Sequence, residues 1–164
     1  MDLSKSRVTI VILVLLGMGV LMIGTIYTLS MNTGTSDRVL TIDAVPLESN
    51  GNASFALRSE NGTKYIETEP PGADITYPDA KNYTSLDFRK KPALRMSELD
   101  IENSDVINAI NEASRENRVI TTTLEGSQTK SVDSRLNSLH NGPFIVFIED
   151  SRRAVYLQYT ITER

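Results

Sequence analysis

Most catalytic and metal sites are built from histidine, cysteine and closely spaced acidic residues, and this sequence offers few of them. The 164-residue chain has no cysteine, which excludes thiol nucleophiles and thiolate metal ligands. His140 is the single histidine. It follows a predicted helix without a G-x-S-x-G motif, so we expect it to interact with helix-terminal carbonyl groups and not to act as a base. Glycine-rich phosphate-binding motifs are missing too, and the sequence predicts no catalytic residue and no cofactor.

Four acidic residues, Glu98, Asp100, Glu102 and Asp105, lie close together in the sequence. The alternation from Asp100 through Glu102 to Ser104 is similar to an oxygen-rich calcium loop, but it lacks the glycine and the distal glutamate of an EF-hand. Acidic side chains also favour the positive end of a helix. We therefore expect these residues to surround the start of a helix, and we predict no metal site.

Arg89, Lys90 and Lys91 form a short basic cluster. This cluster could contact anionic lipid headgroups or an acidic partner. The alternative is a solvated loop bounded by Pro92. The chain as a whole has a formal net charge of −4, which gives no support to nucleic-acid binding.

Asn-x-Ser/Thr acceptors occur at Asn52, Asn61 and Asn82, which are candidate glycosylation sites. About two such triplets are expected by chance from this content of asparagine, serine and threonine, so their number alone decides nothing. Asn61 also precedes Gly62, and this pair is typical of a tight turn. Asn61 is thus a turn residue first and a candidate glycan site second.

An uncharged apolar segment covers residues 8–29. As a helix these 22 residues are about 33 Å long, close to the hydrocarbon thickness of a bilayer. The segment therefore predicts a transmembrane helix, and Gly17 and Gly24, which lie near one face of it, are candidates for helix–helix contact. A cleaved signal peptide is the main alternative, although its apolar region is usually shorter.

The flanking charges predict the orientation of this helix. Lys5 and Arg7 precede it, whereas no lysine or arginine follows it before Arg38, so the amino end is expected in the cytoplasm. The basic leader and apolar helix also resemble pilin-like secretion signals, which implies a secreted envelope subunit as an alternative. The predicted organisation is a cytoplasmic tail (1–7), a transmembrane helix (8–29), a tether (30–37) and an extracytoplasmic domain (38–164).

Two hairpins are predicted in the domain. The first turns at Asn61-Gly62 and pairs Leu57 with Ile66 and Phe55 with Thr68 on an inward face, and Arg58 with Tyr65 on the other. The second joins residues 144–149, apolar enough for a central strand, to residues 154–162 across 150–153. Further strands are expected at 38–45, ended by Pro46, at 83–88 and at 118–125.

Two helices are expected, one from Ser104, as its capping residue, to about Asn117, and one over 131–139 with a left-handed stop at Gly142. Hairpins segregated from helices predict an α+β domain with an antiparallel or mixed sheet packed by two helices. A β-sandwich is the alternative if residues 104–116 are not helical.

These features predict a single-pass, membrane-anchored extracytoplasmic interaction module, a non-enzymatic accessory subunit of a membrane or cell-envelope complex. Its expected partners are membrane lipid, through residues 8–29, and another membrane or envelope protein. An extracytoplasmic ligand-binding or sensory domain that signals through a partner is the alternative. A pocket of several hundred cubic ångströms lined by aromatic side chains would favour that alternative.

Overall fold

A computed structural model of the chain describes residues 38–51, 53–77 and 88–163. The predicted transmembrane helix, the tether, Gly17, Gly24, Asn52, Asn82 and most of the strand expected at 83–88 lie outside these residues. No helix within the described residues is long and apolar enough to cross a membrane.

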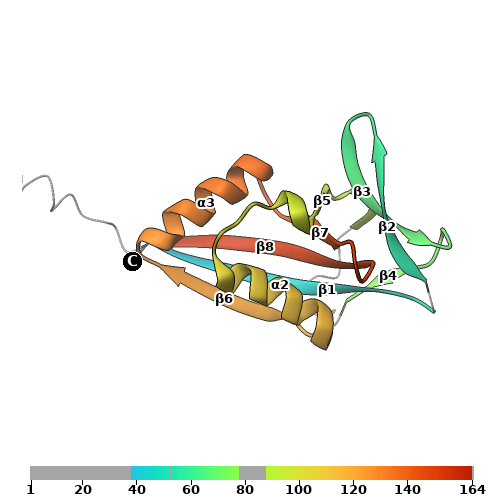
Figure 1. Cartoon of the computed structure of the whole chain (residues 1–164), viewed down its shortest axis with the longest axis horizontal. Coiled ribbons are helices and arrows are strands. Elements are labelled where there is room, and N and C mark those ends of the chain that lie inside the picture. The colour runs from blue at the N-terminus through green and yellow to red at the C-terminus, as the bar shows by residue number, and fades with distance from the viewer. Residues whose placement is uncertain (1–37, 52, 78–87, 164) are drawn as a thin grey trace, which may run out of the picture. The chain divides into compact units, whose positions relative to one another are not determined.

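A mixed six-stranded sheet forms the centre of the domain (Figure 1). Its path runs β4-β1-β8-β7-β5, and β6 pairs with β1 as well. All pairs are antiparallel except β5 with β7. The strands are β1 (Arg38–Ser49), β4 (Ile75–Thr76), β5 (Ala93–Arg95), β6 (Ile120–Glu125), β7 (Phe144–Ile148) and β8 (Arg153–Glu163).

The long strand β1 does not end at Pro46, as the sequence predicted. It continues to Ser49, and Pro46 is paired with Val155 of β8. Proline has no backbone N–H, so it is tolerated in a strand where that N–H would face no neighbouring strand. Pairing of β1 with β6 stops at Ala44, and its pairing with β4 begins only at Glu48. Pro46 lies in the gap between these two partners.

Two helices, α2 (Ser104–Glu116) and α3 (Ser127–Leu139), cover one face of the sheet. The predicted α+β class is thereby confirmed, and the β-sandwich alternative is wrong. Alternate residues of the strands point toward these helices. The resulting core contains Leu40, Ile42, Ala44, Val106, Ile110, Ala113, Leu124, Val132, Leu136, Phe144, Val146, Val155 and Leu157, all buried.

The helix ends differ in detail from the predictions. Asn103, not Ser104, caps α2: its side-chain oxygen accepts hydrogen bonds from the backbone N–H groups of Asp105 (3.0 Å) and Val106 (3.2 Å). Helix α3 begins four residues earlier than expected, directly after Gly126, whose φ is +65°. It ends because His140 is extended; Gly142, with φ +121°, lies two residues further on and is not a left-handed stop.

The first hairpin, β2 (Ser54–Glu60) and β3 (Thr63–Glu69), is confirmed with its predicted register. Asn61 (φ +51°) and Gly62 (φ +80°) both adopt the positive φ that a two-residue type I′ turn requires. This hairpin is a separate two-stranded sheet at the end of the domain farthest from the C-terminus (Figure 1). Its inward face joins a second core, which contains Val45, Leu47, Phe55, Ile66, Phe88, Ala93, Ile145, Phe147, Ala154 and Tyr156.

The second hairpin is confirmed as β7 and β8, with its turn one residue earlier than predicted. Ile148 pairs with Arg153, so Arg153 belongs to β8 and the turn covers 149–152. The first four residues of β7 are all buried, and they point alternately into the first core and the second core. Strand β7 is therefore buried on both faces, as expected for a central strand. Two short 3-10 turns, η1 (Phe88–Lys90) and η2 (Met96–Glu98), flank β5.

Candidate functional site

A groove of about 510 Å³ lies where three distant parts of the chain meet. The end of β1 and the start of β2 form one wall, the last turn of α2 forms another, and the β7–β8 turn forms the third. We call it the arginine groove. Its lining includes Leu47, Glu48, Phe55, Ser114, Arg115, Asn117, Ser151, Arg152 and Arg153.

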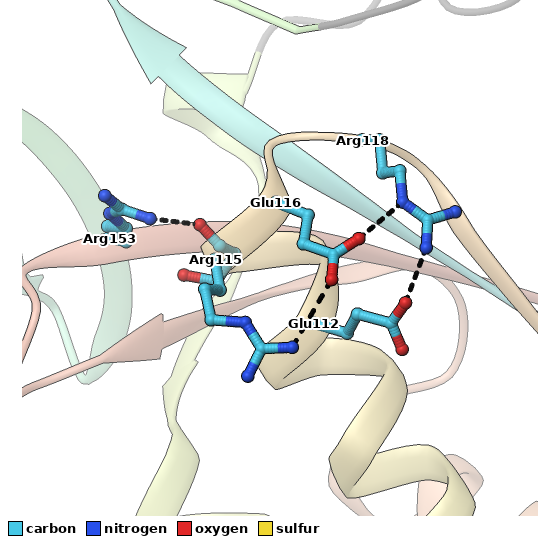
Figure 2. Close-up of polar contacts among 6 residues, drawn as sticks. Glu112, Arg115, Glu116, Arg118 and Arg153 are labelled. Atoms are coloured by element: carbon cyan, nitrogen blue, oxygen red, sulfur yellow. Dashed lines mark hydrogen bonds and ion pairs between the residues drawn. The ribbon is translucent and has the colours of Figure 1, made fainter.

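Three arginines line the arginine groove from two directions, Arg115 from α2 and Arg152 and Arg153 from the β7–β8 hairpin. Arg153 donates a hydrogen bond to the backbone carbonyl of Ser114 (Figure 2). The last four carbonyls of a helix have no partner within the helix. Arg153 therefore satisfies one of them and fastens the hairpin to the end of α2.

The Arg115 side chain is 76% exposed, compared with 48% for that of Arg152. One of its nitrogens lies 3.4 Å from a carboxylate oxygen of Glu116 (Figure 2). Arg118 contacts the same carboxylate at 2.7 Å and that of Glu112 at 2.6 Å. The hydrogen bond from Arg118 lowers the pKa of Glu116 below its ordinary value of 4.5. Arg115 and Arg118 thus share the Glu116 carboxylate, while most of the Arg115 side chain stays exposed.

Arg152 is held in place by the first hairpin. Its guanidinium donates to the carboxylate of Glu69 on β3, which also accepts from Arg58 at 2.8 Å. The hydrogen bond from Arg152 is the main reason that the pKa of Glu69 lies below its ordinary value of 4.5. A guanidinium has five N–H donors, so one carboxylate partner leaves others for a ligand.

Positive charge exceeds negative charge in the lining of the arginine groove. Against the three arginines stands Glu48, whose carboxylate accepts a hydrogen bond from the side-chain amide of Asn117. Guanidinium groups bind carboxylates and phosphates through paired, charge-assisted hydrogen bonds. The arrangement therefore suits an anionic ligand or an acidic segment of another protein.

The basic cluster singled out in the sequence lies elsewhere and does not contribute to the arginine groove. Arg89 donates to the backbone carbonyl of Ala73 at 3.0 Å, and the backbone N–H of Lys91 donates to the carbonyl of Phe88. The side chain of Lys90 lies outside the described part of the structure. Arg89 thus has a structural contact that links η1 to the segment before β4.

Two members of the acidic cluster, Glu98 and Asp100, form contacts within the domain. Glu98 forms an ion pair with Lys64 of β3 and accepts the backbone N–H of Arg95 at 2.9 Å. The contact with Lys64 lowers the pKa of Glu98 from 4.5. Asp100 lies 3.6 Å from Arg135 of α3. No group of three histidine or acidic residues within the described part of the chain is arranged to hold a metal ion.

His140 takes part in the structure through its backbone. Its N–H donates to the carbonyl of Leu136 at 3.0 Å, and its own carbonyl accepts the hydroxyl of Tyr159 at 3.0 Å. The bond from Tyr159 fastens the end of α3 to β8.

Asn61 is exposed at the tip of the first hairpin, and its glycosylation stays a prediction.

Sequence reasoning missed the arginine groove because its arginines are scattered. Arg115 and Arg152 are 37 positions apart, and only the packing of α2 beside the β7–β8 hairpin places them in one groove. The adjacent pair Arg152-Arg153 in a predicted hairpin turn was the one available signal.

Comparison of the chain with protein-family models, with curated proteins and with solved structures gives no match in any of the three.

Proposed function

We propose that this chain is a single-pass membrane-anchored module whose extracytoplasmic domain binds another membrane or envelope protein. Residues 8–29 would form the anchor, and the arginine groove would receive an acidic segment of the partner. The observation that carries this proposal is the convergence of Arg115, Arg152 and Arg153 on one groove from two separate elements. Such a site recognises carboxylates and steers an acidic partner toward it.

The polar lining of the arginine groove favours a peptide segment over a small apolar ligand. Small-molecule pockets are mostly lined by hydrophobic and aromatic side chains. Here the lining is largely polar and charged, and Phe55 is its one aromatic residue among those described. The volume of about 510 Å³ is nevertheless within the usual range for small ligands, so an anionic small molecule is the second candidate.

The position of the arginine groove also suits a membrane-anchored receptor. The segment before the domain joins it at Arg38, which begins β1, whereas the groove is lined by Pro46 to Ser49 at the other end of the same strand. Twelve residues of extended strand span roughly 36 Å. A partner in the groove would therefore lie up to about that far from Arg38, where the predicted tether would join the domain.

Site-specific photo-crosslinking of the full chain in native membranes tests this function. A photoreactive residue in place of Ser151, which is exposed and lines the groove, should crosslink to an acidic segment of a protein that mass spectrometry then identifies. Crosslinking should weaken as salt concentration rises, since screening reduces the attraction between exposed charges. Arg115→Glu should lower the yield by about tenfold, because a like charge then faces the acidic segment.

Arg95→Glu is the matched control. Arg95 is also exposed, with 53% of its side chain accessible, but it lies outside the arginine groove, so its replacement should leave the yield unchanged. Equal yields from the Arg115→Glu and Arg95→Glu variants would refute an acidic partner in the groove. Absence of a protein crosslink, together with a tightly bound anion lost in Arg115→Glu, would favour the small-ligand alternative.

A further inference from the structure

Strand β6 (Ile120–Glu125) is an edge strand whose sequence lacks the usual features that prevent pairing with a strand of another molecule. It pairs with β1 along its whole length, and no strand in the described part of the chain pairs with its other side. Protein edge strands are commonly protected by lysine, proline, a bulge or shortness. The sequence ITTTLE has neither lysine nor proline, is β-branched at its first four positions, and carries its single charge at the end.

The opposite edge of the sheet shows the protection that β6 lacks. Strand β5 is three residues long, follows Pro92, ends in Arg95 and leads directly into a 3-10 turn. A second strand has little length there on which to pair. Of these two edge strands, β6 is therefore the one with enough length for pairing.

The sequence of β6 is nearly symmetric about Thr122. It reads Ile-Thr-Thr-Thr-Leu from Ile120 to Leu124. Thr121 and Thr123 are exposed, whereas Ile120 and Leu124 belong to the core on the helix side, with Ile120 only partly buried. The strand therefore presents the same chemistry in both directions, with Thr121 and Thr123 on one face and Ile120 and Leu124 on either side of Thr122 on the other.

We propose that β6 pairs antiparallel with β6 of a second copy of this chain, centred on Thr122. Directly opposed side chains in an antiparallel pair lie on the same face, so a symmetric pair must be centred on a residue. Centring on Thr122 sets Ile120 against Leu124 of the second copy, and Thr121 against Thr123. Two apolar pairs and two threonine pairs result, both of which stabilise sheets.

The charges of β6 are compatible with a second copy as the pairing partner. In this register Glu125 lies opposite Val119, so no like charges face each other. Ile120, partly exposed in one copy, is covered by the other. The two sheets become one continuous sheet, and both unprotected β6 edges are removed. This inference is independent of the arginine groove, which β6 does not line.

Disulfide crosslinking of the full chain in mild detergent tests the pair directly. The chain has no cysteine, so a single introduced thiol reports one position. Opposed residues have Cα atoms about 4.5–5.5 Å apart, within the range that a disulfide spans. Thr122→Cys should give a covalent dimer on mild oxidation. Thr160→Cys, exposed on β8 and outside the pair, should remain monomeric and serves as the control.

A charge exchange at the exposed positions provides an independent test. Thr121→Lys with Thr123→Lys places lysine against lysine twice and should weaken dimerisation roughly fivefold or more in sedimentation experiments. Thr121→Lys with Thr123→Glu instead places lysine against glutamate twice and should restore it. Circular dichroism checks that both variants fold. A monomeric wild-type chain, equal dimerisation of both variants, or crosslinking by Thr160→Cys in place of Thr122→Cys would overturn the proposal.

Discussion

Replacement of Ile66 by alanine should destabilise the whole domain, because the first hairpin is part of its core. Ile66 has no exposed surface and packs with residues of β1, β7 and β8 in the second core. The change removes three carbon atoms, and at about 0.8 kcal/mol each the lost transfer free energy is about 2.4 kcal/mol. A residual cavity raises the total to within roughly 2–5 kcal/mol. That is a large part of the 5–15 kcal/mol by which typical domains are stable.

Pulse proteolysis of the full chain in mild detergent, across a urea series, measures this loss as a change in the free energy of unfolding. Ile161→Ala is the matched control, since Ile161 is 37% exposed near the end of β8. Its cost should stay below about 1.5 kcal/mol, because solvent fills the vacated space and less surface is buried. A cost below about 0.5 kcal/mol for Ile66→Ala would mean that the hairpin folds and unfolds separately from the sheet.

Three further predictions concern the cap, the turn and the acid stability. Asn103→Ala should destabilise the domain by about 1 kcal/mol in urea unfolding, while Ser104→Ala should be nearly neutral; the reverse order would restore Ser104 as the cap of α2. Gly62→Ala should cost about 1 kcal/mol, because its φ of +80° is strained for any other residue, and hydrogen exchange of the hairpin amides would reveal the loss. The pKa of Glu69 is lowered in the folded state, mainly by Arg152, so its contribution to stability is present above pH 4.5 and is lost as pH falls through the lowered value. The decline of stability between pH 7 and pH 3 should therefore be smaller in Glu69→Gln than in the wild type, and an equal decline would contradict the contact.

Local signals in the sequence predicted the elements whose geometry depends on local chemistry. The Asn61-Gly62 pair set the register of the first hairpin, because positive φ at both positions selects one turn type. The apolar segment Phe144–Ile148 indicated a strand buried on both faces, and it has that position. The apolar stripe of α2 likewise predicted its extent to within a residue.

Features that depend on the sheet order could not be predicted. Proline interrupts a strand only where its missing N–H would have to bond a neighbouring strand, and the gap beside Pro46 exists because β6 and β4 pair with different parts of β1. The three-residue β5 is too short to show a period, and its parallel pairing with β7 depends on a distant segment. The shared lining of the arginine groove by Arg115 of α2 and Arg152 of the β7–β8 turn likewise required the assembled domain.

Strand β1 runs from Arg38 at one end of the domain to the arginine groove at the other, so it determines how the domain resists a pulling force. Tension applied between Arg38 and the β7–β8 turn runs along β1, perpendicular to its hydrogen bonds with β8. The ten residue pairs from Arg38 with Glu163 to Leu47 with Ala154 then share the force and must rupture together. Pulling single molecules through residues 38 and 151 should accordingly require a higher force than opening the β7–β8 hairpin from its strand ends, where the pairs separate one at a time.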